Sequence, residues 1–76
     1  MADKTQYSVV LFYSTSSALY AERLFKKMGM SVKPIPVPRH LSSDCGICIR
    51  FERSDEAKIK QILDEKLIET QGIHPV

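Results

Sequence analysis

The chain has 76 residues, of which 43% are hydrophobic and 26% are charged. This length and composition predict one soluble globular domain over residues 1–76 and argue against a disordered chain. The net charge is only +2 and the lysines and arginines form no run, which argues against a nucleic-acid partner. No apolar stretch reaches the roughly 18 residues of a membrane span, and the first residues lack a secretory signal. We therefore expect a cytoplasmic protein.

The first half of the chain is predicted to form a strand, a helix and a second strand. Residues 8–13 form an unbroken apolar run, typical of a central strand buried on both faces. The hydroxyl residues 14–17 can cap a helix that ends at Gly29. Residues 31–38 carry three prolines at alternate positions, which predicts an edge strand. The apolar residues of the helix recur at helical spacing and are expected in the core: Ala18, Ala21, Leu24, Phe25 and Met28.

The second half repeats strand, helix, strand. Residues 46–51 alternate, with Ile47, Ile49 and Phe51 on one face and Cys48 and Arg50 on the other. A second helix is predicted to begin at residues 54–56, where Ser54 supplies a cap and Asp55 and Glu56 favour the helix dipole. Residues 72–76 can form a short last strand, and Pro75 again indicates an edge. The buried stripe of the second helix is expected to be Ile59, Ile62, Leu63 and Leu67.

The order β-α-β-β-α-β predicts an α+β fold, a ferredoxin-like sandwich with two helices on one face of an antiparallel sheet. With the strand order 4-1-3-2, the loop of residues 39–45 lies at the same end of the sheet as the start of the first helix. Cys45 would then lie near backbone N–H groups that carry about half a positive charge. This environment, with Arg39 also close, should lower the pKa of the Cys45 thiol.

The two cysteines, Cys45 and Cys48, have the CxxC spacing of redox enzymes. In those enzymes the motif lies at a helix start, whereas here Cys48 belongs to a strand pattern. Residues three apart on a strand point to opposite faces, which makes a disulfide between them awkward. The simpler interpretation of Cys48 is a small residue on the sheet face. In a reducing compartment, any chemistry of these cysteines would be thiol chemistry.

Other sites built on the same loop are weaker hypotheses. His40, Cys45 and Cys48 supply three metal ligands, one fewer than a structural zinc site needs, and His74 is expected at the opposite end of the sheet. We therefore expect no metal and no cofactor. A nucleophilic Cys45 with His40 as its base is conceivable, but only Asp44 could orient that base. The residues alone also leave open the interpretation that Cys45 is a half-buried structural residue without a chemical role.

The chain also resembles a known family, the putative selenium/sulfur carrier protein-like family, over nearly its whole length, from Val9 to His74. The most specific match is a Pro-Arg, a serine and a Cys-Gly in one loop. The Ser-Thr at the start of the first helix matches as well, with an alanine and a glutamate further on. In this sequence the matching residues are Pro38, Arg39, Ser43, Cys45, Gly46, Ser14, Thr15, Ala18 and Glu22.

This resemblance implies a small cytoplasmic carrier, rather than a true enzyme, that holds sulfur or selenium on Cys45. Arg39 would be the cationic partner, Gly46 would allow close approach of the backbone, and the N–H groups near Ser14 and Thr15 would stabilise the bound anion. Cys48 is outside the motif, where a residue such as alanine would serve, and is at most a second thiol.

The implied partners are sulfur or selenium donor and acceptor proteins, with no nucleic acid and no membrane, and the oligomeric state stays open. Two other classes of function remain open beside the carrier. One is a ferredoxin-like regulatory or protein-interaction module without thiol chemistry. The other is a thiol-redox protein that uses both cysteines.

Overall fold

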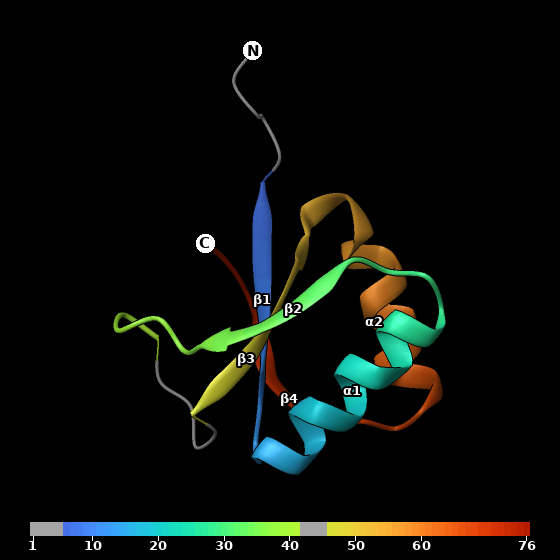
Figure 1. Ribbon diagram of the computed structural model, residues 1–76, viewed down its shortest axis with the longest axis horizontal. Helices are drawn as coiled ribbons and strands as arrows, with labels where there is room; N and C mark the ends of the chain where they lie inside the picture. The colour runs from blue at the N-terminus through green and yellow to red at the C-terminus, as the bar shows by residue number, and fades with distance from the viewer. Residues whose placement is uncertain (1–5, 42–45) are drawn as a thin grey trace.

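The protein is an antiparallel four-stranded sheet with two helices on one of its faces (Figure 1). The computed structural model describes residues 6–41 and 46–76. The strand order is β2-β3-β1-β4, which read from the other edge is β4-β1-β3-β2, the order assumed in the sequence analysis. The elements are β1 (Tyr7–Phe12), α1 (Thr15–Lys27), β2 (Val32–Pro36), β3 (Ile47–Glu52), the 3₁₀ helix η1 (Arg53–Asp55), α2 (Glu56–Glu65) and β4 (Thr70–Pro75).

The two edge strands are the two that contain proline, as predicted. In β2, the Val37 N–H that follows the strand donates to the Gly46 carbonyl, 3.3 Å away. Backbone groups in an antiparallel pair alternate in direction, so the positions of Pro34 and Pro36 face away from β3. Because proline has no N–H, these two residues remove donors from the free edge and discourage another strand from pairing there.

The main core lies between the sheet and both helices. As predicted, Ile49 and Phe51 point into this core and Ile47 packs against it, while Cys48 points to the other face. Leu24 is only half-buried but packs against the same cluster. The buried members of the core are Val10, Phe12, Ala18, Ala21, Phe25, Ile49, Phe51, Ile59, Ile62 and Leu63.

Two residues predicted for the core are exposed: Met28 by 59% and Leu67 by 87%. Both lie where their helix has already ended. Met28 is the C-cap of α1, and the next residue, Gly29, has a φ of 82°, a left-handed conformation that glycine adopts without strain. Leu67 takes the same position after α2 with a φ of 54°. Ile68 packs against the core in its place, with its N–H on the Leu63 carbonyl.

The start of α2 also differs from the prediction. Ser54 does not cap the helix; it lies in η1, and α2 begins at Glu56. The N-cap is Asp55, whose side chain makes no capping hydrogen bond. The reason is that the chain first continues along β1, where the backbone N–H and the Nε of Arg53 donate to the carbonyls of Gln6 and Tyr7 at 2.9 and 3.1 Å.

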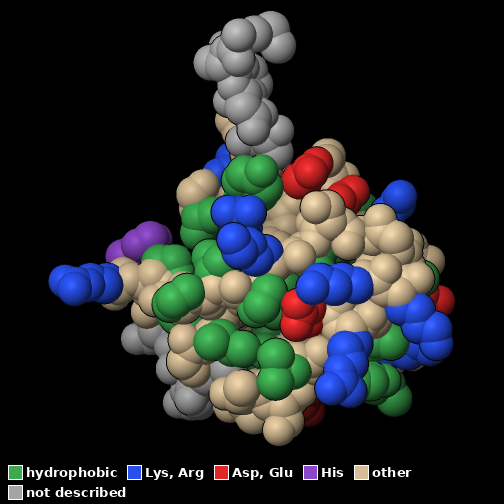
Figure 2. Space-filling model, viewed as in Figure 1, with side chains coloured by type: hydrophobic (Ala, Val, Ile, Leu, Met, Phe, Trp, Pro, Cys, Tyr) green, Lys and Arg blue, Asp and Glu red, His purple; other side chains and the backbone are tan. Residues whose placement is uncertain are grey.

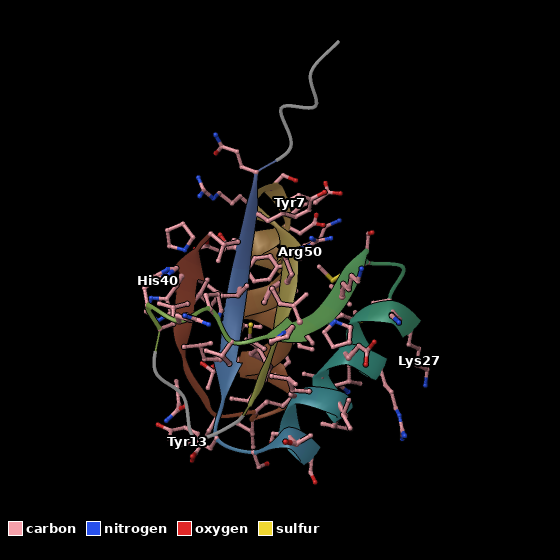
Figure 3. The ribbon with its side chains drawn as sticks, turned by 60° about the vertical axis from the view of Figure 1, so that its left-hand side comes forward. Tyr7, Tyr13, Lys27, His40 and Arg50 are labelled. Atoms are coloured by element: carbon pink, nitrogen blue, oxygen red, sulfur yellow. The ribbon has the colours of Figure 1, made fainter. Side chains whose placement is uncertain are left out.

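The opposite face of the sheet carries no helix and is covered in part by residues 37–41, which cross it after β2 (Figure 3). Val9, Leu11 and Cys48 are buried there, and Val37 and Leu41 pack against them. We call these five residues the second cluster. Further along this face, the Arg50 guanidinium stacks 4.2 Å from the centre of the Tyr7 ring (Figure 3).

The surface is mixed in character. Lys and Arg side chains are scattered among hydrophobic and acidic ones on the face viewed in Figure 2. Within residues 6–41 and 46–76, neither helix has the length and apolar character needed to cross a membrane.

Candidate functional site

The connection between β2 and β3 emerges at the same end of the sheet as the start of α1. Cys48 pairs with Leu11, the penultimate residue of β1, and also with Ile35 of β2. Gly46 therefore lies at the level where β1 gives way to α1. Cys45, on which the carrier hypothesis depends, lies outside the described residues, as do Ser43 and Asp44.

Ser14, one of the four hydroxyl residues expected to supply a cap, is the N-cap of α1. Its backbone is extended, its Oγ accepts a hydrogen bond from the Ser17 N–H at 3.2 Å, and its carbonyl accepts from the Ala18 N–H at 3.1 Å. The Ser14 hydroxyl also donates to the Ser17 Oγ at 3.1 Å. Thr15 is the first helical residue, and both Ser14 and Thr15 are exposed. This end of a 13-residue helix therefore presents its positive dipole end to solvent.

Arg39 lies in a turn on the helix-free side of the sheet. The turn is closed by a hydrogen bond from the Leu41 N–H to the Pro38 carbonyl at 3.0 Å. Arg39 and His40 form its tip, and both are exposed; His40 is labelled in Figure 3. Among the described residues, no hydrogen bond or ion pair holds the Arg39 guanidinium. The structure thus leaves this cation accessible and does not join it to Ser14.

Gly46 is exposed, and its backbone conformation does not require a glycine at this position. Only Gly29 and Gly72 have a positive φ among the described glycines. A Cβ built on Gly46 meets no atom within 4 Å. The expected role of Gly46, close approach of the backbone, therefore has no counterpart in the packing within the described chain.

Cys48 is a buried thiol with 0% exposure. Its side chain points away from the helices into the second cluster, and its Sγ lies 4.0 Å from the Pro36 carbonyl oxygen, to which the thiol can donate. The structure therefore places Cys48 as a small residue inside the sheet face, as the simpler interpretation predicted.

Two further residues of the family motif have structural roles. Ala18 is fully buried in the main core at the first turn of α1. Glu22 forms an ion pair with Lys26 at 2.8 Å, one helical turn away. An ion pair between residues four apart on a helix typically contributes only about 0.3–0.5 kcal/mol. We therefore assign neither residue to the chemistry of the site.

An open groove of about 400 Å³, which was not predicted from the sequence, lies beside the Ser14 cap. Tyr13, Ser17 and Tyr20 line it from the start of α1, and residues 66–69 line it from the connection after α2. Both tyrosines are 51% exposed. Within α1, the three-residue spacing of Ser17 and Tyr20 was a signal, because it places both on one side of the helix, next to the buried stripe; Tyr13 precedes the N-cap.

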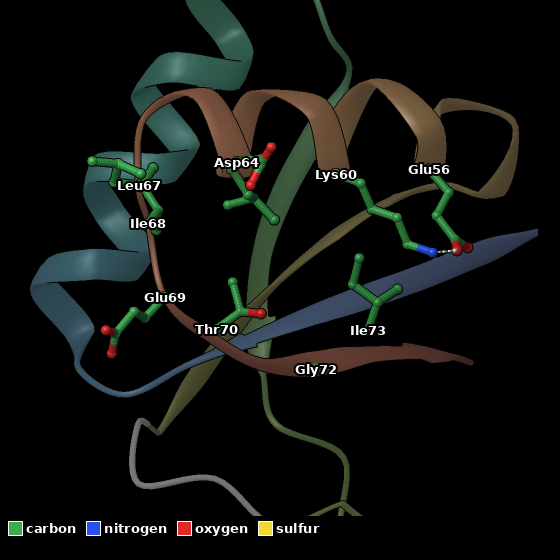
Figure 4. Close-up of a pocket in the computed structure, with 10 residues that line it drawn as sticks. Glu56, Lys60, Asp64, Leu67, Ile68, Glu69, Thr70, Gly72 and Ile73 are labelled. Carbon is green, nitrogen blue, oxygen red and sulfur yellow. Dashed lines mark ion pairs between the residues drawn. The ribbon is translucent and has the colours of Figure 1, made fainter.

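A second open groove, of about 610 Å³, runs between α2 and β4 (Figure 4). The Glu56–Lys60 ion pair, 3.0 Å long, lies at one end, and Leu67, Ile68 and Glu69 are shared with the first groove. No three His, Cys, Asp or Glu side chains of residues 6–41 and 46–76 are grouped so that they could hold a metal ion.

Comparison with known proteins adds one finding. The sequence model of the family described as putative Se/S carrier protein-like matches residues 6–75. No curated protein and no solved structure matches the chain. The family match spans every strand and helix described above, together with the β2–β3 connection. The chain therefore belongs to the putative Se/S carrier protein-like family.

Proposed function

We propose that this protein is a carrier of sulfur or selenium and that Cys45 is its carrier thiol. The observation that carries the proposal is membership of the Se/S carrier protein-like family over residues 6–75. The fold supports it, because the connection that contains Cys45 leaves the sheet beside the exposed start of α1. Strand order and the position of both helices also support a ferredoxin-like classification.

Loading would be a thiol exchange. A donor persulfide, R–S–S⁻, is attacked at its outer sulfur by the Cys45 thiolate. The S–S bond of the donor breaks, R–S⁻ leaves with the electron pair, and Cys45–S–S⁻ forms. The step needs no added oxidant, since the transferred atom already has the oxidation state of sulfane sulfur. A selenium donor of the same type would load Cys45 in the same way.

The remaining site residues would stabilise the negative charge on the sulfur of Cys45 or leave room for the donor to reach it. The N–H groups in the first turn of α1, near Ser14 and Thr15, favour an anion at this end of the sheet. Arg39 is an accessible cation on the same connection, and its attraction lowers the proton affinity of a nearby thiolate. Gly46 would keep the space next to Cys45 clear for the donor, which agrees with the open space at the position that a Cβ of residue 46 would occupy. The donor and acceptor would be cytoplasmic proteins.

The test is intact-mass analysis after the protein is incubated with a cysteine desulfurase and cysteine. Wild type and Cys48→Ala should each gain one sulfur atom, removable by a reducing thiol, whereas Cys45→Ser should gain none. Equal loading of wild type and Cys45→Ser would contradict the assignment of Cys45. A wild-type protein that takes up no sulfur from this donor, nor selenium from a selenocysteine-fed reaction, would contradict the carrier function itself.

A further inference from the structure

The second cluster seals Cys48 from solvent on a face of the sheet that has no helix. Cys48 has 0% exposure, and Val9 and Leu11, which pack beside it on the adjacent strand β1, are exposed by 0% and 1%. Val37 and Leu41 pack over these three residues from the same connection that contains Cys45. Two backbone hydrogen bonds fix this cover: Val37 N–H to the Gly46 carbonyl at 3.3 Å and Leu41 N–H to the Pro38 carbonyl at 3.0 Å.

This burial decides how a loaded carrier can release its cargo. With two accessible thiols, the second would attack the persulfide, form an intramolecular disulfide and expel hydrogen sulfide. That route needs the Cys48 Sγ to reach its target. The Sγ is instead enclosed, and the backbone from Gly46 to Cys48 is extended by its pairing with β2, which separates residues along the strand by about 3.3 Å each.

We propose that release requires an acceptor that brings its own thiolate, and that Cys48 takes no part. This inference rests on the proposed function. It adds that the acceptor, the second partner of the carrier, must itself supply a thiolate. The acceptor thiolate attacks the outer sulfur of Cys45–S–S⁻; the S–S bond breaks, Cys45 leaves as the thiolate, and the acceptor becomes the persulfide. The outer sulfur is transferred to the acceptor without net oxidation or reduction, and no free sulfide is produced in the step.

The inference is tested on protein loaded with sulfur and freed of donor by gel filtration. One sample is kept alone and one receives glutathione as the acceptor thiol; intact mass is read without reductant, and sulfide is measured. Alone, wild type should keep its extra sulfur and show no species that has lost two hydrogens. With glutathione, the extra sulfur should leave wild type and Cys48→Ala at equal rates. If wild type alone releases sulfide severalfold faster than Cys48→Ala and forms an internal disulfide, the inference is wrong.

A second measurement separates this inference from the proposed function. In Cys45→Ser the remaining thiol is Cys48, and its alkylation by iodoacetamide does not depend on loading. In native protein we expect labelling at least about 100-fold slower than in urea-unfolded protein, since the reagent must wait for the second cluster to open. Equal rates in native and unfolded protein would overturn the sealed position of Cys48. A protein that fails to load overturns the carrier function and, with it, the role of the acceptor.

Discussion

The two faces of the sheet are built in different ways. Within residues 6–41 and 46–76, the main core on the helix-covered face has ten buried hydrophobic residues, drawn from both helices and two strands. Among the same residues, the opposite face has three, and part of its cover is residues 37–41, which belong to the connection that contains the candidate carrier cysteine. Within the described part of the chain, the helix-covered face thus holds most of the apolar burial, while packing on the other face holds residues 37–41, among them Arg39. The difference suggests that changes on the first face act on folding, whereas changes on the second act on thiol chemistry at a smaller cost in stability.

The comparison can be tested most strongly on two neighbours in β3, Ile49 and Cys48, which are both fully buried but on opposite faces. Ile49→Ala should lower the free energy of unfolding by about 2–5 kcal/mol. Cys48→Ala removes one methyl-sized group and should cost about 1 kcal/mol. Urea denaturation measures both. An equal loss of unfolding free energy in the two variants would show that the two faces contribute equally to stability.

Leu41→Ala tests the cover of the second face. Leu41 is only half-buried, so we expect a loss of about 1–2 kcal/mol. In native Leu41→Ala, alkylation of Cys48 should become markedly faster than in wild type, because part of its cover is removed. Val32→Ala is a matched control, since Val32 is also half-buried but packs on the helix side. In Val32→Ala, Cys48 should stay protected from alkylation. Equal rates of Cys48 alkylation in the two variants would contradict a specific role of Leu41 in covering Cys48.

The ends of the two helices allow a finer test within the helix-covered layer. Gly29 and Leu67 occupy equivalent left-handed positions after α1 and α2. Because a left-handed conformation costs a non-glycine residue about 1–2 kcal/mol, Leu67→Gly should raise stability by up to about 1 kcal/mol and Gly29→Ala should lower it by about the same amount. Thermal unfolding measures both. A destabilised Leu67→Gly would mean that the exposed leucine makes a contribution not explained by its backbone.

The smallest expected change in stability is at Gly46. Its Cβ position is empty and its φ is not positive, so Gly46→Ala should change the free energy of unfolding by less than about 0.5 kcal/mol. If the space next to Cys45 serves the donor, the same variant should load sulfur more slowly than wild type. Unchanged stability with unchanged loading would remove Gly46 from the site.

Much of the fold could be predicted because local patterns and packing agree. The alternation of residues 47–51 indicates which side chains face the helices, and the prolines of β2 indicate the edge of the sheet. Apart from the start of α2, where Ser54 lies in η1, the errors lie where a helix ends. Periodicity alone extends a buried stripe to Met28 and Leu67, but it does not indicate at which turn the backbone leaves the helix. No glycine marks the end of α2, since a leucine takes the left-handed position there.

The candidate site could be predicted only in part. The cap at Ser14 follows from its hydroxyl side chain and its place before an amphipathic helix. The exposure of Arg39 and the burial of Cys48 depend on how residues 37–41 cross the sheet, which is a long-range packing choice. The cover of Cys48 therefore does not follow from local patterns, although the strand pattern assigns the correct face. The roles of Cys45 and of its surrounding residues stay predictions.

The most direct test of the central claim, that Cys45 is the working thiol, is residue-resolved labelling of native protein with iodoacetamide across a range of pH. Cys45 should label first and already near neutral pH, while Cys48 should stay unlabelled until the protein unfolds. If Arg39 is the cationic partner that we propose, Arg39→Ala should shift the Cys45 profile to higher pH, because it removes a positive charge that favours the thiolate. Labelling of Cys48 before Cys45, or a Cys45 profile no more acidic than that of a free thiol, would contradict the account.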